Sequence, residues 1–181
     1  MDKYFNYHMH STYSNASTTD SVTNIECLIK RAIELGQDSF CVTEHGNMLS
    51  KYETSFLCKK YKIKQIVGAE FYFVKDRLKE TESETIDKKT KLPTKIKDRT
   101  NSHIIMIAKN RNGYEQLNTI SSWANIDGFY GKPRIDLDLI NKYVNENDVI
   151  ITTACCASFV AKYGIEIIQE FQRFIDAGNS K

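Results

Sequence analysis

The sequence predicts an α/β fold, because short buried strands alternate along it with amphipathic helices. Apolar residues between 25 and 33 recur at the spacing of one helical face. Short runs rich in β-branched residues, such as 39–43 and 149–153, end in polar residues, as strands of α/β proteins do. This alternation favours parallel strands joined by crossover helices. Periodicity alone leaves open whether those strands form an open sheet or a barrel.

Size and composition indicate one globular domain over residues 1–181. The chain is 41% hydrophobic and 27% charged, which is ordinary for a soluble protein. It contains no apolar run of about 20 residues and no signal peptide, so we expect a cytoplasmic protein without membrane contact. Five cysteines without a disulfide-framework spacing suit a reducing compartment. The net charge of +2 is too small to indicate nucleic-acid binding by itself.

The first predicted strand runs through Tyr4, Phe5 and Tyr7. Side chains two positions apart on a strand point to the same face, so His8 and His10 are expected to lie side by side. Two imidazoles on one face form half of a site for a divalent metal. The alternative is two unrelated histidines near a loosely held terminus. A polar stretch at 14–20 follows and predicts a loop.

The first predicted helix covers residues 25–33, with Thr23 or Asn24 as its N-cap and Gly36 as its C-cap. A short buried strand at 39–43 follows it. That strand leads directly into the polar sequence Glu44-His45-Gly46-Asn47.

A second helix is predicted at 50–61, with an apolar face of Tyr52, Phe56 and Leu57, and a long strand at 65–74. Glu70 lies inside that apolar strand, where a carboxylate is costly unless it is paired or bound to metal. The lysine-rich segment 75–101 predicts a mobile excursion. The positive charge of residues 75–99 is a weak indication of phosphate or nucleic-acid contact, and a solvated loop is the better explanation.

The C-terminal half predicts two further strands and three helices. A strand at 104–108 follows His103, and a strand at 149–153 precedes Cys155. The predicted helices pass through residues 114–124, begin at Asp136 after a loop at 128–134, and cover 165–175. The chain therefore contains about five predicted strands, without an internal repeat or an interdomain linker.

The residues that could bind metal all fall at or beside the predicted strands. Because the ends of parallel strands converge on one rim, we expect a shared cleft that contains His8, His10, Asp20, Glu44, His45, Glu70, His103 and Cys155. Imidazole, carboxylate and thiolate groups suit zinc, iron or manganese. Glu70 could bridge two ions, as in phosphoester hydrolysis. The chain lacks a Ser–His–Asp arrangement, a Walker loop and, after its first strand, the glycine-rich turn that a dinucleotide fold requires.

Several motifs in this order resemble the PHP (polymerase and histidinol phosphatase) domain family. They are His8-Met9-His10-Ser11 with Tyr13-Ser14, Thr43-Glu44-His45-Gly46-Asn47, Gly68-Ala69-Glu70-Phe71, and His103 with its hydrophobic strand. The stretches 107–110 and 128–136 resemble the branch of the family at the N-terminus of bacterial or phage DNA polymerase III alpha subunits. The resemblance covers nearly all 181 residues.

The resemblance implies a distorted seven-stranded (β/α)7-type barrel with up to three zinc, manganese or iron ions at the strand ends. Its metal ligands match His8, His10, Asp20, His45, Glu70, His103 and Cys155. Glu44 stands where the family usually has Asp. The family pattern ends with an Asp and a His that nothing here matches, so we expect an incomplete barrel, either a piece of a longer protein or one whose open edge is covered by a partner or a second copy.

The resemblance therefore suggests a metal-dependent phosphoesterase, most specifically a 3′–5′ exonuclease on DNA. In this hypothesis His10, His45 and Glu44 serve catalysis, and Lys132 and Arg134 contact phosphate. A second hypothesis is a non-catalytic metal-binding module that supports a replicative polymerase. A third is a free-standing phosphatase of small phosphate esters. The chain has no polymerase core, so nucleotide polymerisation is excluded as its own activity.

Overall fold

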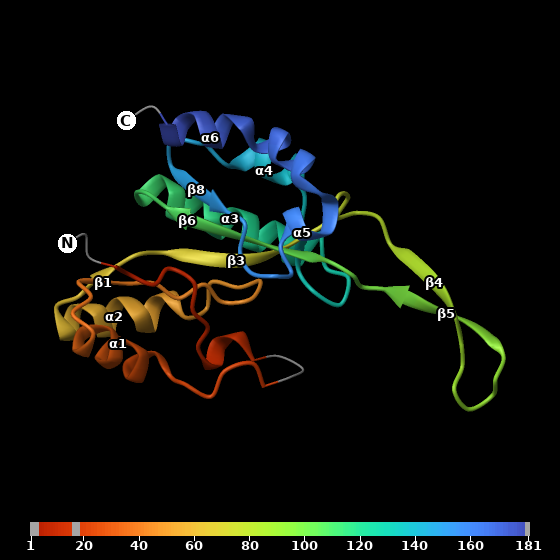
Figure 1. The fold of residues 1–181 in the computed structure, drawn as a ribbon, viewed down its shortest axis with the longest axis horizontal. Coiled ribbons are helices and arrows are strands. Elements are labelled where there is room, and N and C mark those ends of the chain that lie inside the picture. The colour runs from red at the N-terminus through yellow and green to blue at the C-terminus, as the bar shows by residue number, and fades with distance from the viewer. Residues whose placement is uncertain (1–3, 16–18, 180–181) are drawn as a thin grey trace.

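In the computed structural model, which describes residues 4–15 and 19–179, a four-stranded sheet lies among helices (Figure 1). Its strand order is β7-β3-β6-β8, and the strands are β3 (Gly68–Phe73), β6 (Ser102–Ala108), β7 (Arg134–Ile135) and β8 (Val149–Thr152). The predicted α/β class is confirmed. Residues 16–18 of the loop predicted at 14–20 lie outside the described residues.

The prediction of parallel strands is wrong for the longest pairings. β3 pairs antiparallel with β6, and β6 pairs antiparallel with β8, whereas only the short β7 runs parallel to β3. The segment between β3 and β6 contains no helix, and a parallel connection requires a crossover that is usually helical. The described strands form separate sheets that do not close into a barrel.

The remaining strands form two smaller sheets. β1 (Ser39–Phe40) pairs parallel with β2 (Lys64–Gln65), and β4 (Thr81–Ile86) forms an antiparallel hairpin with β5 (Pro93–Asp98). The hairpin extends away from the body of the molecule (Figure 1). Its register places Glu82 opposite Lys97 and Glu84 opposite Lys95, and opposite charges at such positions stabilise a ribbon. The lysine-rich segment, predicted as a mobile excursion, thus contains a regular hairpin, and its mobility stays a prediction.

The first predicted strand is also wrong, because residues 4–10 have no regular secondary structure. The segment is nevertheless attached to the body, since the backbone N–H of Thr43 donates to the carbonyl of Met9 at 2.8 Å. A short 3₁₀ helix, η1 (Thr12–Ser14), follows it.

Six α-helices lie within the described residues: α1 (Ile25–Glu34), α2 (Lys51–Tyr61), α3 (Arg111–Ile126), α4 (Leu137–Tyr143), α5 (Phe159–Tyr163) and α6 (Gln172–Asn179). The predicted N-cap of the first is confirmed, because the Asn24 side chain accepts a hydrogen bond from the N–H of Cys27 at 2.9 Å. The predicted apolar face of α2 is wrong in part, since Tyr52 is 87% and Phe56 is 63% exposed. The predicted C-terminal helix is divided between the 3₁₀ helix η2 (Ile165–Phe171) and α6. Within the described ranges no helix has the length and apolar character needed to cross a membrane.

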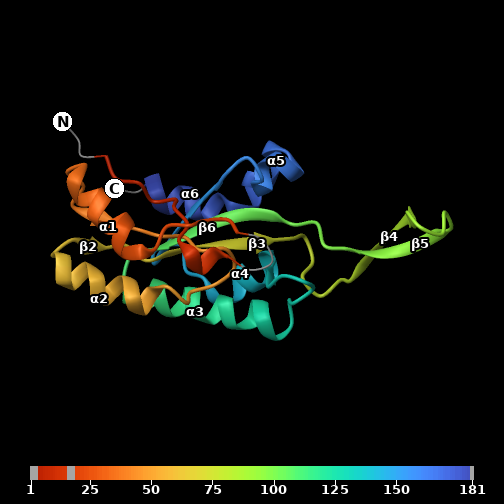
Figure 2. The same ribbon diagram turned by 90° about the horizontal axis from the view of Figure 1, so that it is seen from below.

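The core fixes which face of β3 is free for chemistry. Ala69, Phe71 and Phe73 are fully buried in one apolar cluster, to which α3 contributes Leu117 and Ile120. Figure 2 shows α3 on one side of β3 and β6, with α5 on the other. Because side chains alternate along a strand, packing of the odd-numbered residues turns Glu70 and Tyr72 to the opposite face.

We expect the variant Gly113→Ala to lower the free energy of unfolding, although alanine normally stabilises a helix interior by about 1 kcal/mol relative to glycine. A Cβ at position 113 would lie 2.2 Å from the backbone carbonyl oxygen of Asp148. The backbone shift that removes this clash should lower the free energy of unfolding by about 1–3 kcal/mol. Urea unfolding measures this change. The exposed neighbour Asn112→Ala, in the same turn of α3, is the control and should be neutral or stabilising. Equal stabilisation by both variants would contradict this close packing.

Candidate metal centre

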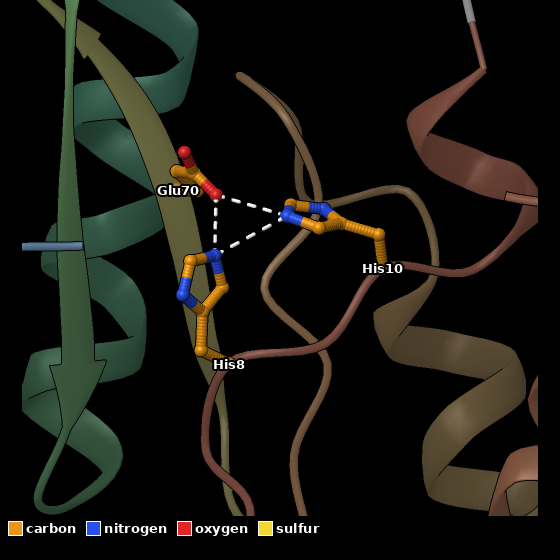
Figure 3. Close-up of side chains that lie close together, drawn as sticks. All are labelled: His8, His10 and Glu70. Carbon is orange, nitrogen blue, oxygen red and sulfur yellow. Dashed lines mark hydrogen bonds and ion pairs between the residues drawn. The ribbon is translucent and has the colours of Figure 1, made fainter. Parts of the chain in front are cut away.

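A buried carboxylate, Glu70, lies at the centre of the site. It is 1% exposed, and its Oε2 lies 2.8 Å from His8 Nε2 and 3.0 Å from His10 Nε2. Figure 3 shows both imidazoles pointing from the N-terminal segment toward this oxygen. On the other side, Nδ1 of His103 contacts the second carboxylate oxygen, Oε1. The His-x-His half-site predicted from sequence therefore faces the strand-embedded glutamate.

The described residues provide three groups of side chains that could each hold a metal ion. In each group one ligand atom per residue lies within 4.8 Å of the others, and the groups are His8–His10–Glu70, His10–Asp20–His45 and His45–Glu70–His103. Every pair of groups shares one residue, namely His10, His45 or Glu70. The shared residues place the three candidate positions next to one another, and Glu70 could bridge two ions.

Backbone pairing brings these side chains together. The segment with His45 lies beside β3, because the N–H of Glu70 donates to the Glu44 carbonyl at 3.1 Å and the N–H of Gly46 donates to the Glu70 carbonyl at 2.7 Å. His103, the second residue of β6, lies directly opposite Tyr72 in the antiparallel register. The residues do converge as predicted, but through an antiparallel pair and two flanking segments rather than through the ends of parallel strands.

The predicted thiol ligand, Cys155, lies at the edge of this cluster. Its Sγ is 3.5 Å from His103 Nδ1 and 3.9 Å from Glu70 Oε1. The preceding Ala154 has a φ of +62°, a left-handed conformation that is strained for a residue with a Cβ. Burial raises the pKa of the Cys155 thiol, so a cation beside it would be needed to stabilise the thiolate that binds metal.

Behind the histidines, Ser14 connects His10 to the buried carboxylate of Glu44. The Ser14 hydroxyl donates to Glu44 Oε2 at 2.5 Å, and Nδ1 of His10 lies 2.9 Å from the same Oγ. Because the only hydroxyl proton is used toward Glu44, His10 must donate through Nδ1–H. When Nε2 carries no proton, as in a metal complex, it presents its lone pair on the side of Glu70. Such a contact fixes the tautomer of a metal-binding histidine.

Glu44 itself is completely buried and fully engaged. Its two oxygens accept from the Ser11 hydroxyl at 2.6 Å, the Ser11 N–H at 3.2 Å and the Ser14 hydroxyl. It belongs to none of the three metal-competent groups. The structure therefore places Glu44 as a residue that positions Ser14 and, through it, His10.

The side chains of the cluster are better placed as ligands of a cation than as hydrogen-bond partners of one another. If His10 is neutral, its Nε2 lone pair faces the carboxylate of Glu70 at 3.0 Å, and His8 Nε2 lies 3.3 Å from His10 Nε2. Nδ1 of His45 is buried and has no hydrogen-bond partner among the described residues. Ligands of a tetrahedral metal at about 2.0–2.2 Å lie roughly 3.3–3.6 Å apart. A divalent ion would satisfy these acceptors with little rearrangement.

The pKa values of Glu70 and His45 also favour a bound cation. Burial raises the pKa of Glu70, but hydrogen bonds from His10, His103 and His8 outweigh it and hold the pKa of this carboxyl well below its usual range. Burial and the neighbouring His10 lower the pKa of His45. Near neutral pH, Glu70 is therefore ionised and His45 is neutral, which are the protonation states that metal ligands require.

Two of the remaining predicted residues differ in their exposure. The ammonium of the exposed Lys132 lies 4.2 Å from the ring centroid of Tyr72, and that ring is 5.9 Å from the ring of His45. Arg134, by contrast, is buried and donates to the backbone carbonyls of residues 77, 79 and 128. The structure thus corrects the expectation that Arg134 contacts phosphate, because its guanidinium holds loop backbone together.

Sequence reasoning missed two residues of the site, Ser14 and Tyr72. Tyr72 is 8% exposed, and burial, followed by the charge of Glu70, raises the pKa of its hydroxyl to about 12. Its position two residues after Glu70 on one strand would have placed it on the same face. Ser14 belongs to the first motif of the family resemblance, but its role could not be predicted, because it depends on the contact with Glu44, thirty residues away.

Comparison with known proteins identifies relatives over most of the chain. The model of the family described as "PHP domain" matches residues 6–178. DNA polymerase III subunit alpha of Aquifex aeolicus is 36% identical over 149 residues, and that of Borreliella burgdorferi is 30% identical over 177 residues. These alignments cover 82% and 98% of this chain but only 12% and 14% of the relatives. The chain thus spans a small part of their length.

A solved structure from Bifidobacterium adolescentis, proposed to be a metal-dependent phosphoesterase, also matches. It aligns with 90% of this chain and 52% of its own length, with 13% sequence identity and a TM-score of 0.34. A TM-score this low does not establish a shared fold.

The variant Ser14→Ala should weaken divalent-metal binding about 10- to 100-fold, because it removes the group that orients His10 and fixes its tautomer. Isothermal titration with Mn²⁺ or Zn²⁺ measures this affinity directly. Thr119→Ala is a suitable control, since its hydroxyl bonds only to a helical carbonyl on α3. Unchanged metal affinity in a folded Ser14→Ala protein would contradict the role of Ser14.

Proposed function

This chain belongs to the PHP domain family, and from its site we propose that it is a metal-dependent phosphoesterase that hydrolyses phosphodiester bonds. The observation that supports the proposal most is the sharing of Glu70, His10 and His45 among three adjacent groups of metal-competent side chains. Neighbouring divalent ions that share a carboxylate are the usual means of in-line phosphoester hydrolysis. We further propose that Cys155 completes the ligand set beside His103.

Each residue of the site has a definable task in this proposal. When bound, the divalent ions would polarise the scissile phosphate and lower the pKa of a water molecule. His10 and His45 hold ions in more than one group, and Glu44 keeps His10 oriented through Ser14. The ammonium of Lys132, over the ring of Tyr72, is placed to neutralise charge on a phosphate that approaches His45.

We propose DNA as the substrate and a 3′–5′ exonuclease as the specific activity. The support is contextual, because the named relatives are DNA polymerase III alpha subunits. A cleft of about 640 Å³ beside the site supports it further. His45 and the polar α3 residues Asn118 and Ser121 line this cleft. Amide and hydroxyl groups can hydrogen-bond to sugars and bases without a fixed charge.

A second candidate is a metal-stabilised module that supports a replicative polymerase without hydrolysis. It is favoured by the origin of the candidate ligands, because the three groups draw residues from segments far apart in the chain, which bound ions would hold together. The incomplete barrel is part of this proposal, with a partner or a second copy at the edge of β8, the last strand of the sheet.

The decisive variant is His10→Ala, which removes a residue shared by two of the groups. We expect fewer ions bound per chain, and a rate of cleavage of a 3′-labelled oligonucleotide at least about 100-fold lower, since even outer positioning groups cost 10- to 100-fold. Metal content is measured by mass spectrometry after gel filtration, and cleavage by denaturing electrophoresis. Glu34→Gln removes an exposed carboxylate on α1 outside the site; it is the control and should change neither quantity.

The outcomes separate the candidates. Bound metal without cleavage of any phosphoester would exclude the enzyme and favour the supporting module. Faster hydrolysis of a small phosphate ester than of DNA would indicate a phosphatase instead. A wild-type protein that binds no divalent ion would contradict the site itself.

A further inference from the structure

A second cavity, separate from the metal-competent residues, is strongly basic. It has a volume of about 530 Å³ and lies between α2, β2 and the start of α3. Four cationic side chains line it, and neither Asp nor Glu does. We call this cavity the basic pocket and define it by Lys51, Tyr52, Lys64, Lys109, Arg111 and Tyr114.

The cations of the basic pocket are only partly neutralised by neighbouring groups. Arg111 pairs with Glu115 at 2.8 Å, but both side chains are largely exposed, so the pair contributes little. Lys109 donates to the backbone carbonyl of Glu146, which leaves its charge in place. Lys64 has no carboxylate partner within the described part of the chain. An anion is therefore the ligand that this cavity would favour.

The buried cation Lys51 strengthens the case for an anion. Its side chain is 6% exposed, and its ammonium donates to the carbonyl of Val42 at 2.6 Å. Burial lowers the pKa of this ammonium to about 8, and the neighbouring Glu44 carboxylate offsets that effect only in part, so the charge remains costly. An anion in the basic pocket would offset part of that cost.

Two aromatic rings indicate which anion is suitable. Tyr52 is 87% exposed although it lies on a helix, and Tyr114 lines the same cavity. Sites for single-stranded nucleic acid combine a positively charged groove for the backbone with aromatic faces on which bases stack. A free phosphate would need the cations alone.

We propose that the basic pocket binds single-stranded nucleic acid, with phosphate groups at Lys64, Lys109 and Arg111 and a base stacked on Tyr52. This site would hold a strand away from the metal centre, and no metal ligand contributes to it. The inference rests on the proposed nucleic-acid substrate, but it does not require cleavage.

The test is fluorescence anisotropy of a labelled oligothymidine in EDTA, where metal-dependent cleavage cannot occur. Lys64→Gln/Arg111→Gln should weaken binding roughly tenfold and reduce the slope of log affinity against log salt by about 1.4, since each contact to a single strand contributes about 0.7. Tyr52→Ala should weaken binding at least about fivefold through lost stacking. The control Lys88→Gln/Lys89→Gln removes the same charge from exposed positions in the turn of the β4–β5 hairpin and should bind like wild type.

Several results would overturn the proposal. They are wild-type affinity in the pocket variant, an equal or greater loss in the hairpin variant, and no binding by the wild type. Displacement of the oligonucleotide by millimolar pyrophosphate, together with an unaffected Tyr52→Ala protein, would show that the pocket takes free phosphate instead. Circular dichroism confirms that each variant is folded. Because no cleavage is measured, failure here is distinguishable from failure of the proposed phosphoesterase activity.

Discussion

The arrangement of the site depends on burying the carboxylate of Glu70 in the middle of an apolar sheet. Transferring an ionised carboxylate from water to a protein interior is very costly unless charges or hydrogen bonds compensate it. Here the imidazoles of His8, His10 and His103 hydrogen-bond to the carboxylate, and the ring of His45 lies 3.8 Å from it, so the surrounding rings come from three separate segments. Each of these segments is therefore held against β3 by the same group. A change at Glu70 would leave several rings close together without a shared partner.

A second, completely buried carboxylate supports the first. Glu44 is neutralised by hydroxyl and amide donors rather than by imidazoles, and those donors come from Ser11 and Ser14. The two glutamates are connected through Ser14 and His10, so the orientation of a candidate ligand is set by a buried group that touches no metal-competent position. Polar networks of this kind are effective only when every member is satisfied. Their satisfaction also explains how residues 8–11 hold a defined position without regular secondary structure.

Most of the metal-competent residues could be predicted from sequence, although the fold reasoning behind them was partly wrong. Local patterns were enough to find the His-x-His pair, the buried glutamate and helix α1 with its cap at Asn24. The direction of β6 could not be read locally, because it depends on whether the connection from β3 contains a helix. Arg134 looked like a phosphate ligand for a similar reason, since nothing in the sequence shows which carbonyls will surround a guanidinium. In each case the missing information was a long-range contact.

The number of protein ligands per group bears on whether the site is catalytic. Structural metal sites are closed by four protein ligands, whereas catalytic ones keep a position open for water or substrate. Each of the three groups found among the described residues supplies three ligands, and Cys155 lies beside the His45–Glu70–His103 group as a further candidate. Ions held by these residues would keep open coordination positions beside the cleft that His45 borders. A purely structural role would have no use for such positions, and for this reason we favour hydrolysis over the supporting module.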